Sequence, residues 1–150
     1  MAADADITDQ ELAELVRRTE EATSAYMRGE MDRYLELTHH TRGYTLINPL
    51  GGPPTIYDDR AKSVRASADY FKGGEAKLEL TQAHAWGDTV VLVMIERQHG
   101  QVGGLPDQDW PLRVTQVHRR DGSDWVLVHR HADPLVHPID LEQAAALARA

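Results

Sequence analysis

The spacing of hydrophobic residues predicts that the chain begins with two helices. Over residues 8–28, apolar side chains recur every three or four positions with charged residues between them, which is typical of an amphipathic helix. Thr8 and Glu11 have the spacing of a capping box, in which each side chain accepts a hydrogen bond from a free backbone N–H at the helix start. Gly29 ends this helix, and residues 30–38 are predicted to form a second, shorter one.

The rest of the chain is rich in strand-forming segments. Predicted strands cover residues 44–48, 55–57, 76–86 and 89–99, a β-hairpin lies within residues 110–133, and helices are predicted over residues 59–71 and within residues 135–150. Helices that are segregated from a meandering antiparallel sheet place the chain in the α+β class. A length of 150 residues fits one domain with a single core, with residues 135–150 as a C-terminal extension.

The predicted hairpin carries the densest cluster of chemically reactive side chains. Its turn, residues 121–124, places a glycine between other turn formers, and two β-rich segments flank it. If Arg119 faces Trp125, Thr115 faces His129 and Arg113 faces His131, so that these four residues share one face of the sheet. A register shifted by one residue would instead place Val114 and Gln116 opposite the two histidines.

Charge and cysteine content exclude several classes of partner. Sixteen Lys and Arg against 24 Asp and Glu give a formal net charge of −8, which disfavours nucleic acid and anionic membrane surfaces as partners. The absence of cysteine rules out disulfides and thiolate metal sites. The first ten residues do not resemble a signal peptide, and no apolar segment approaches the length of a membrane span, so a cytoplasmic protein is expected.

The strand over residues 89–99 is apolar on both faces, which predicts self-association. Val90, Leu92 and Met94 alternate with Val91, Val93 and Ile95. One set is expected to pack against the helices, and the other must be covered by something else, most economically a second copy of the chain. We therefore expect a homodimer formed through the outer face of the sheet.

The order of elements resembles the cone-shaped fold of nuclear transport factor 2, ketosteroid isomerase and the SnoaL-like polyketide cyclases. The C-terminal hairpin is also similar to the association domain of calcium/calmodulin-dependent kinase II. The residues that carry this similarity are Arg113-Val114-Thr115, Arg119-Arg120-Asp121-Gly122, Trp125 and His129-Arg130-His131. The resemblance implies a strongly bent antiparallel sheet wrapped around the N-terminal helices, with a deep pocket on one face and association through the other.

The functional positions of these relatives match this chain only in part. Where ketosteroid isomerases place an Asp general base just before a proline, this chain has Asn48 before Pro49, and an amide cannot take up that proton. Ala22 falls where those enzymes have an oxyanion-binding tyrosine. In the kinase association domain the pocket carries buried arginines, and the resemblance places Arg97 on one of those positions and Thr115 on another.

The predicted pocket therefore combines aromatic, amide, arginine and histidine side chains. His131 is the candidate general base and Arg113 the group that would stabilise an oxyanion, while the expected ligand contacts are Arg97, Tyr44, Asn48, Thr115, His129 and Trp110. Glu79 and Glu96 are expected to point outward, leaving a ligand anion to neutralise the two arginines.

Each candidate also has a purely structural interpretation. The arginines could pair with surface carboxylates, and His129 and His131 could be polar core residues. The tryptophans are most simply packing residues, and His39, His40 and His118 are interpreted as surface or packing residues. No carboxylate completes a metal site around His129 and His131, so neither a metal nor a cofactor is expected.

Two functions remain open on the sequence. The first is a small-molecule-binding protein for an anionic or carbonyl-bearing ligand, which in an enzyme version would carry out isomerase, cyclase or dehydratase chemistry by proton transfer. The second is a non-catalytic association module in which the apolar sheet face carries the function.

Overall fold

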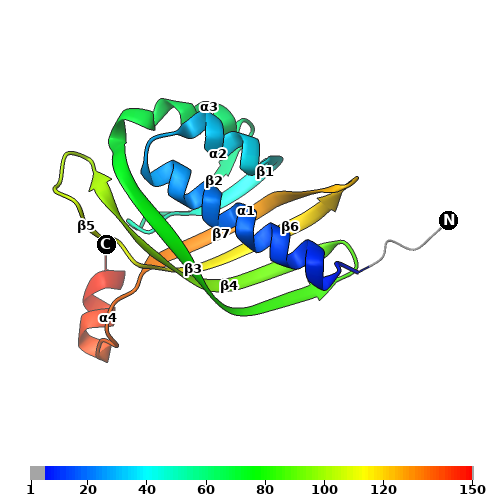
Figure 1. Cartoon of the computed structure of the whole chain (residues 1–150). Helices are drawn as coiled ribbons and strands as arrows, with labels where there is room; N and C mark the ends of the chain where they lie inside the picture. The colour runs from blue at the N-terminus through cyan, green and yellow to red at the C-terminus, as the bar shows by residue number, and fades with distance from the viewer. Residues whose placement is uncertain (1–5, 150) are drawn as a thin grey trace.

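The computed structural model describes residues 6–149 and contains a curled, unclosed sheet with helices on its inner side (Figure 1). The first five residues, on which part of the signal-peptide argument rests, lie outside the described part, as does Ala150. The elements are α1 (Asp9–Met27), α2 (Met31–Leu37), β1 (His40–Ile47), β2 (Thr55–Tyr57), α3 (Arg60–Ala66), the short 3-10 helix η1 (Ala68–Tyr70), β3 (Phe71–Trp86), β4 (Thr89–Val102), β5 (Gln108–Asp109), β6 (Leu112–Asp121), β7 (Asp124–Pro134) and α4 (Leu141–Ala148). The predicted α+β class is confirmed.

The helix α1 begins and ends as the sequence predicts. The Thr8 hydroxyl accepts a hydrogen bond from the Glu11 backbone N–H at 3.0 Å, and the Glu11 carboxylate accepts one from the Thr8 N–H at 3.1 Å. At the other end Gly29 has a φ of 74°, and a Cβ there would lie 2.4 Å from the carbonyl oxygen of Phe71. Only glycine fits this close approach, which lets the chain turn sharply from α1 into α2.

The sheet has the strand order β2-β1-β7-β6-β4-β3, with β5 paired to β4. The β1–β7 pair is parallel, and the other neighbours are antiparallel. Register shifts interrupt the β3–β4 and β6–β7 ladders, and such bulges increase the bend and twist of a strand. The helix α1 lies across the inner face of this curved sheet (Figure 1).

The main hydrophobic core lies between α1 and the inner face. Leu15 of α1 packs there with buried side chains of the sheet, namely Val90, Leu92, Met94, Val114, Trp125 and Ala132. Val90, Leu92 and Met94 are at most 2% exposed, so one apolar set of β4 is buried inside the monomer as expected. Val91, Val93 and Ile95 lie on the other face and remain only partly buried.

We expect Leu15→Ala to lower the free energy of unfolding by about 2–5 kcal/mol, because it removes a buried side chain and leaves a cavity. Leu15 is 6% exposed and belongs to the core. Urea denaturation monitored by circular dichroism measures the change. A loss below about 0.5 kcal/mol would contradict the packing of α1 on the sheet.

The hairpin is present, but both registers considered from the sequence are wrong over most of its length. Next to the turn Arg120 faces Trp125, and beyond a bulge in β7 Thr115 faces His131 and Arg113 faces Asp133. The inserted residue is Val128, since His118 pairs with Leu127 while Val117 pairs with His129.

The predicted grouping of residues on the hairpin survives this shift, but on the opposite face of the sheet. Beyond the bulge the pairing moves by two residues relative to the expected register, which preserves the alternation of faces. Arg113, Thr115, His129 and His131 therefore share a face, but it is the outer one. The buried residues of β6 are their neighbours Val114, Gln116 and His118.

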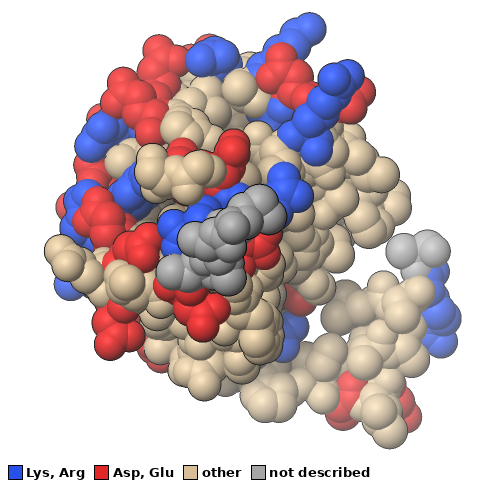
Figure 2. All heavy atoms as spheres, turned by 90° about the vertical axis from the view of Figure 1, so that its right-hand side faces the viewer, with Lys and Arg blue, Asp and Glu red and all other residues tan. Residues whose placement is uncertain are grey.

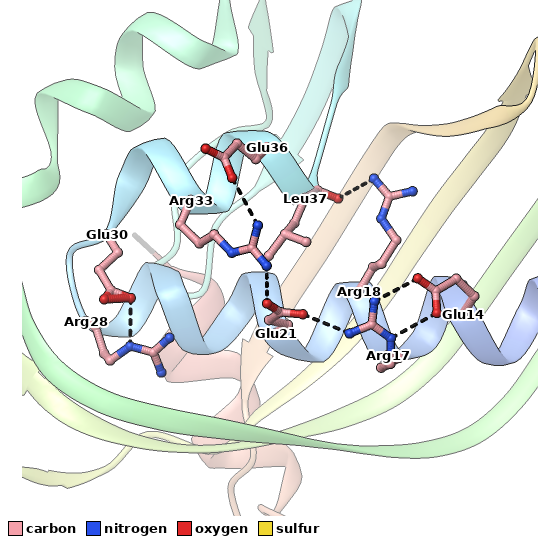
Figure 3. Close-up of polar contacts among 9 residues, drawn as sticks. All are labelled: Glu14, Arg17, Arg18, Glu21, Arg28, Glu30, Arg33, Glu36 and Leu37. Carbon is pink, nitrogen blue, oxygen red and sulfur yellow. Dashed lines mark hydrogen bonds and ion pairs between the residues drawn. The ribbon is translucent and has the colours of Figure 1, made fainter.

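A ladder of ion pairs joins α1 to α2 (Figure 3). Arg17 bridges Glu14 at 2.7 Å and Glu21 at 2.9 Å, and Glu21 also pairs with Arg33 of α2. These side chains are largely exposed, so each pair contributes little stability by itself. On the face seen in Figure 2, acidic and basic side chains alternate without forming a continuous patch of one sign.

The C-terminal helix α4 stands apart from the rest of the fold (Figure 1). Leu141 is 89% and Leu147 74% exposed, and α4 has no buried residue. Asp140 caps it, with its carboxylate accepting a hydrogen bond from the Gln143 backbone N–H at 2.8 Å. Within residues 6–149, no helix combines the length and the hydrophobicity needed to cross a membrane.

Candidate functional site

A cavity of about 370 Å³ lies between the helices and the inner face of the sheet. Its lining comes from α1, α2, α3 and η1 and from the strands β1, β2, β3, β4, β6 and β7, together with the link between α2 and β1 and the segments that follow β1 and precede β6. This volume falls in the range of cavities that hold small organic ligands. The curvature of the sheet creates the space, and α1 covers it.

The structure separates the predicted site residues into two groups. Tyr44, Asn48 and Trp110 line the cavity. The remaining five lie on the outer face of the sheet, so the expectation that they line the pocket is wrong: Arg97, Arg113, Thr115, His129 and His131. Strand alternation turns Arg97 of β4 and Arg113 and Thr115 of β6 away from the helices, because their neighbours Glu96, Val114 and Gln116 are the buried residues. The bulge at Val128 does the same for His129 and His131 of β7.

The outer-face residues have polar partners of their own. Arg97 pairs with Glu79 at 3.1 Å, and Arg113 lies 3.5 Å from Asp133, with side chains 51% and 60% exposed. The His131 Nε2 atom is 3.2 Å from the same Asp133. The two arginines therefore pair with surface carboxylates, as in their structural interpretation. They contribute no positive charge to the cavity.

A buried ion pair that the sequence analysis missed forms part of the cavity wall. Arg130 donates to both carboxylate oxygens of Glu96, at 2.5 and 2.8 Å. Glu96 is fully buried, which corrects the expectation that it points outward. Burial acts to lower the pKa of Arg130, but the charge and hydrogen bonds of Glu96 outweigh it and raise that pKa above its usual value. The pair contributes two opposite charges and no net charge.

Tyr34 and Tyr44 line the cavity, and His40 contacts both of them from outside the lining. The Tyr34 hydroxyl lies 3.1 Å from Nε2 of His40. Burial, followed by the charge of Arg60, lowers the pKa of His40 to about 3. Burial also raises the pKa of Tyr44 to about 12. These groups are uncharged near neutral pH and act as hydrogen-bonding side chains.

Arg60 of α3 supplies positive charge to the cavity. Its guanidinium lies 4.8 Å from the ring centroid of Tyr57 and 5.9 Å from that of Tyr44. One nitrogen donates to the Ser63 hydroxyl at 3.0 Å, whereas Nε is buried without a hydrogen-bond partner. Within residues 6–149 no carboxylate lies within 4.0 Å of it, so its charge is not locally balanced.

His118, which the sequence predicts to be a surface or packing residue, is a buried histidine. It lines the cavity, and its Nε2 atom lies 3.0 Å from the side-chain oxygen of Gln116. Burial, assisted by the charge of Arg18, lowers its pKa to about 4. Its Nδ1 atom is buried without a partner.

At the end of the cavity nearest the hairpin turn, Arg18, His39 and Asp124 meet. Arg18 donates to Asp124 at 3.1 Å. It also donates to the carbonyl of Leu37, the last residue of α2, at 3.2 Å (Figure 3). The His39 Nδ1 atom lies 2.7 Å from the other carboxylate oxygen of Asp124. Burial acts to raise the pKa of Asp124, but hydrogen bonds from His39, the Trp125 backbone and Arg18 together lower it.

The inward position of Glu96 can be predicted from the sequence, whereas that of Arg130 cannot. Glu96 has the same parity as Val90, Leu92 and Met94, so strand alternation alone places it on the inner face. The inward position of Arg130 depends on the bulge at Val128, which no local pattern predicts. Within residues 6–149, no group of three or more His, Asp or Glu side chains is arranged to hold a metal ion.

Comparisons with known proteins agree with this architecture. The SnoaL-like domain profile matches residues 17–136. A nuclear transport factor 2-like protein from Streptomyces avermitilis, provisionally described as a dehydratase, has 16% sequence identity and a TM-score of 0.70, with 87% of this chain and 100% of that chain covered. A nuclear transport factor 2-like protein of unknown function from Pseudomonas putida KT2440 has 17% identity and a TM-score of 0.66, covering 90% and 89%.

The association domain of a calcium/calmodulin-dependent kinase II is a further structural relative. The domain from C. elegans has 16% identity and a TM-score of 0.64, with 84% of this chain and 99% of that chain covered. A search of curated proteins found no match. At these identities the likeness shows the fold and leaves the function to be argued from the site.

Proposed function

The chain belongs to the SnoaL-like domain family, and on that premise we propose that its cavity binds a small organic molecule that carries a carboxylate or a carbonyl group. The observation that carries the proposal is Arg60, a cation in the cavity wall with no carboxylate within 4.0 Å among residues 6–149. An uncompensated charge in a partly buried site is costly, and a ligand oxygen would offset that cost.

The other charges of the cavity wall support this choice of ligand. Arg130 is held by Glu96, and Arg18 is held by Asp124. The lining is otherwise mostly aromatic and aliphatic, with the neutral Tyr44 and His118 among its polar groups. Such a site favours a molecule with an apolar body and one polar or anionic end.

Two of the residues predicted from the sequence are suited to act together with Arg60. The ring of Tyr44 lies beside the Arg60 guanidinium. The side-chain oxygen of Asn48 accepts a hydrogen bond from the Leu50 N–H at 2.7 Å, which leaves its amide N–H groups as donors for a ligand. Trp110 already donates its indole N–H to the Gly100 carbonyl at 3.1 Å, so we assign it to the wall.

Arg60→Gln is expected to weaken the binding of benzoate or levulinate by about 10-fold or more, because it removes a charge-assisted hydrogen bond. Isothermal calorimetry measures the change. Arg97→Gln is the matched control, since Arg97 lies on the outer face and pairs with Glu79. Equal affinity in the wild type and Arg60→Gln, or no binding by the wild type, would contradict the proposed function.

Association of two copies through the outer face is a second candidate, and it is compatible with the first. Val91, Val93, Ile95 and Val117 form a partly buried apolar strip on that face. The structural relatives include proteins described as association and hub domains. Because the strip and the cavity lie on opposite faces of the sheet, association of two copies would not block ligand binding.

The wild type is therefore expected to be a dimer at micromolar concentration, and Val93→Glu is expected to shift it toward the monomer by burying an unpaired charge at the interface. Light scattering should give about twice the chain mass of 16.8 kDa for the wild type. Lys62→Glu, an exposed change on α3 and therefore away from the outer face of the sheet, is the control for added negative charge. A monomeric wild type would remove this candidate.

A further inference from the structure

Three side chains from distant parts of the sequence meet at the hairpin end of the cavity. Arg18 comes from α1, His39 from the link between α2 and β1, and Asp124 from the first position of β7. Asp124 accepts hydrogen bonds from Arg18 at 3.1 Å and from the Trp125 backbone N–H at 2.8 Å on one oxygen. The other oxygen lies 2.7 Å from His39 Nδ1.

This arrangement fixes the tautomer of His39. An ionised carboxylate only accepts hydrogen bonds, so Nδ1 of His39 must be the donor. In the neutral ring Nε2 then keeps its lone pair. An imidazole oriented by a carboxylate through Nδ1, with Nε2 free, is the arrangement of a general base.

His39 is also reachable from solvent, unlike His118 of the cavity lining and the neighbouring His40. Its side chain is 53% exposed and belongs to the cavity lining, so it lies where the cavity meets solvent. His40 uses its Nε2 atom in the contact with Tyr34, and His118 is 4% exposed. Arg18 lines the same end and holds positive charge close to His39.

We propose that His39 is a catalytic base that removes a proton from the carbon next to the carbonyl of a ligand bound in the cavity. Asp124 is a positioning residue that holds the ring, and Arg18 in turn holds Asp124. This inference rests on the proposed function, because it requires a carbonyl compound in the cavity.

The step balances without any further reactant. His39 Nε2 takes the proton, the electron pair of the C–H bond forms the C=C bond of the enolate, and the electrons of the C=O π bond move to oxygen. Return of a proton from the imidazolium to carbon regenerates the ketone and the neutral histidine. In D₂O the Nε2 proton of the exposed imidazolium exchanges with solvent before a deuteron is returned, so that deuterium replaces hydrogen at the α-carbon.

The test measures that exchange by proton NMR, using levulinate, benzoylpropionate and phenylacetone as probes. The wild type should exchange at least one probe at well above the buffer rate, and His39→Gln should reduce the enzymic rate by about 100-fold or more, as for the loss of a general base. His99→Gln is the matched control. His99 forms a similar pair with Asp107 at 3.1 Å and is 47% exposed, but it lies outside the cavity lining.

The variant Asp124→Asn tests whether Asp124 orients the His39 ring or only stabilises the fold. One carboxylate oxygen of Asp124 accepts hydrogen bonds from both Arg18 and the Trp125 backbone N–H. The side-chain oxygen of the new Asn should take that position, so that its NH₂ group faces His39 Nδ1. Nδ1 must then accept, and the ring proton moves to Nε2, which blocks the base. Nitrogen-15 NMR of the His39 ring should show this change of tautomer together with loss of exchange, and Asp124→Glu should restore part of the rate.

Calorimetry with the same probes distinguishes the two proposals. Binding of a probe by the wild type and His39→Gln, with equal exchange rates in both, overturns the role of His39 and leaves the binding function standing. Binding without exchange in the wild type has the same consequence. Failure of every probe to bind overturns the proposed function, and the catalytic role falls with it.

Discussion

Replacing Glu96 with Gln is expected to lower the free energy of unfolding by about 3–5 kcal/mol, because it leaves Arg130 in the protein interior without its counter-charge. The Glu96 side chain is fully buried and that of Arg130 is 18% exposed. Both carboxylate oxygens are used, since the two residues share two hydrogen bonds. Urea denaturation at pH 7 measures the loss.

The double variant Glu96→Gln, Arg130→Met tests the origin of this effect. It removes both charges at once, so it should be considerably more stable than Glu96→Gln alone. The matched control is Glu79→Gln, which breaks the exposed pair with Arg97 and should stay within about 0.5 kcal/mol of the wild type. A Glu96→Gln protein as stable as the wild type would show that the pair is not closed in solution.

The sequence predicts the secondary structure well because its strongest signals are local. The capping box of Thr8 and Glu11 and the alternation of residues 90–95 each depend on neighbours within a few positions. The predicted strand over residues 89–99 is observed as β4 with an extended C-terminal end. Segregation of helices from strands then defines the class without further information.

The site is harder to predict because it depends on which face of each strand turns inward. One additional residue in β7, Val128, decides that Arg130 points into the cavity while His129 and His131 point out. A bulge of this kind is set by the bend that the whole sheet requires, not by the local sequence. Long-range packing places Arg60 in the cavity wall and brings Asp124 against His39 of that wall, and a local sequence pattern does not predict such contacts.

Acid is expected to destabilise this protein at a pH well above the usual range for carboxylates, because the fold keeps the buried His118 and the partly buried His40 neutral. Their pKa values are about 3 for His40 and about 4 for His118, against 6.5 for an unperturbed histidine. Between these values the unfolded chain binds more protons than the folded one, so stability falls as the pH falls. From pH 7 to pH 5 the loss is about 2 kcal/mol for each histidine.

Urea denaturation at pH 7 and pH 5, at one protein concentration, measures this loss. His118→Gln should reduce the pH dependence by about half, whereas His137→Gln, at an exposed position, should leave it unchanged. The carboxylates with lowered pKa values, including Asp124, lose stabilisation only at lower pH. His99 acts in the opposite direction: its raised pKa, caused by Asp107, stabilises the fold at low pH and weakens as the pH rises. A stability unchanged between pH 7 and pH 5 would mean that both rings gain access to water or to an acceptor when protonated.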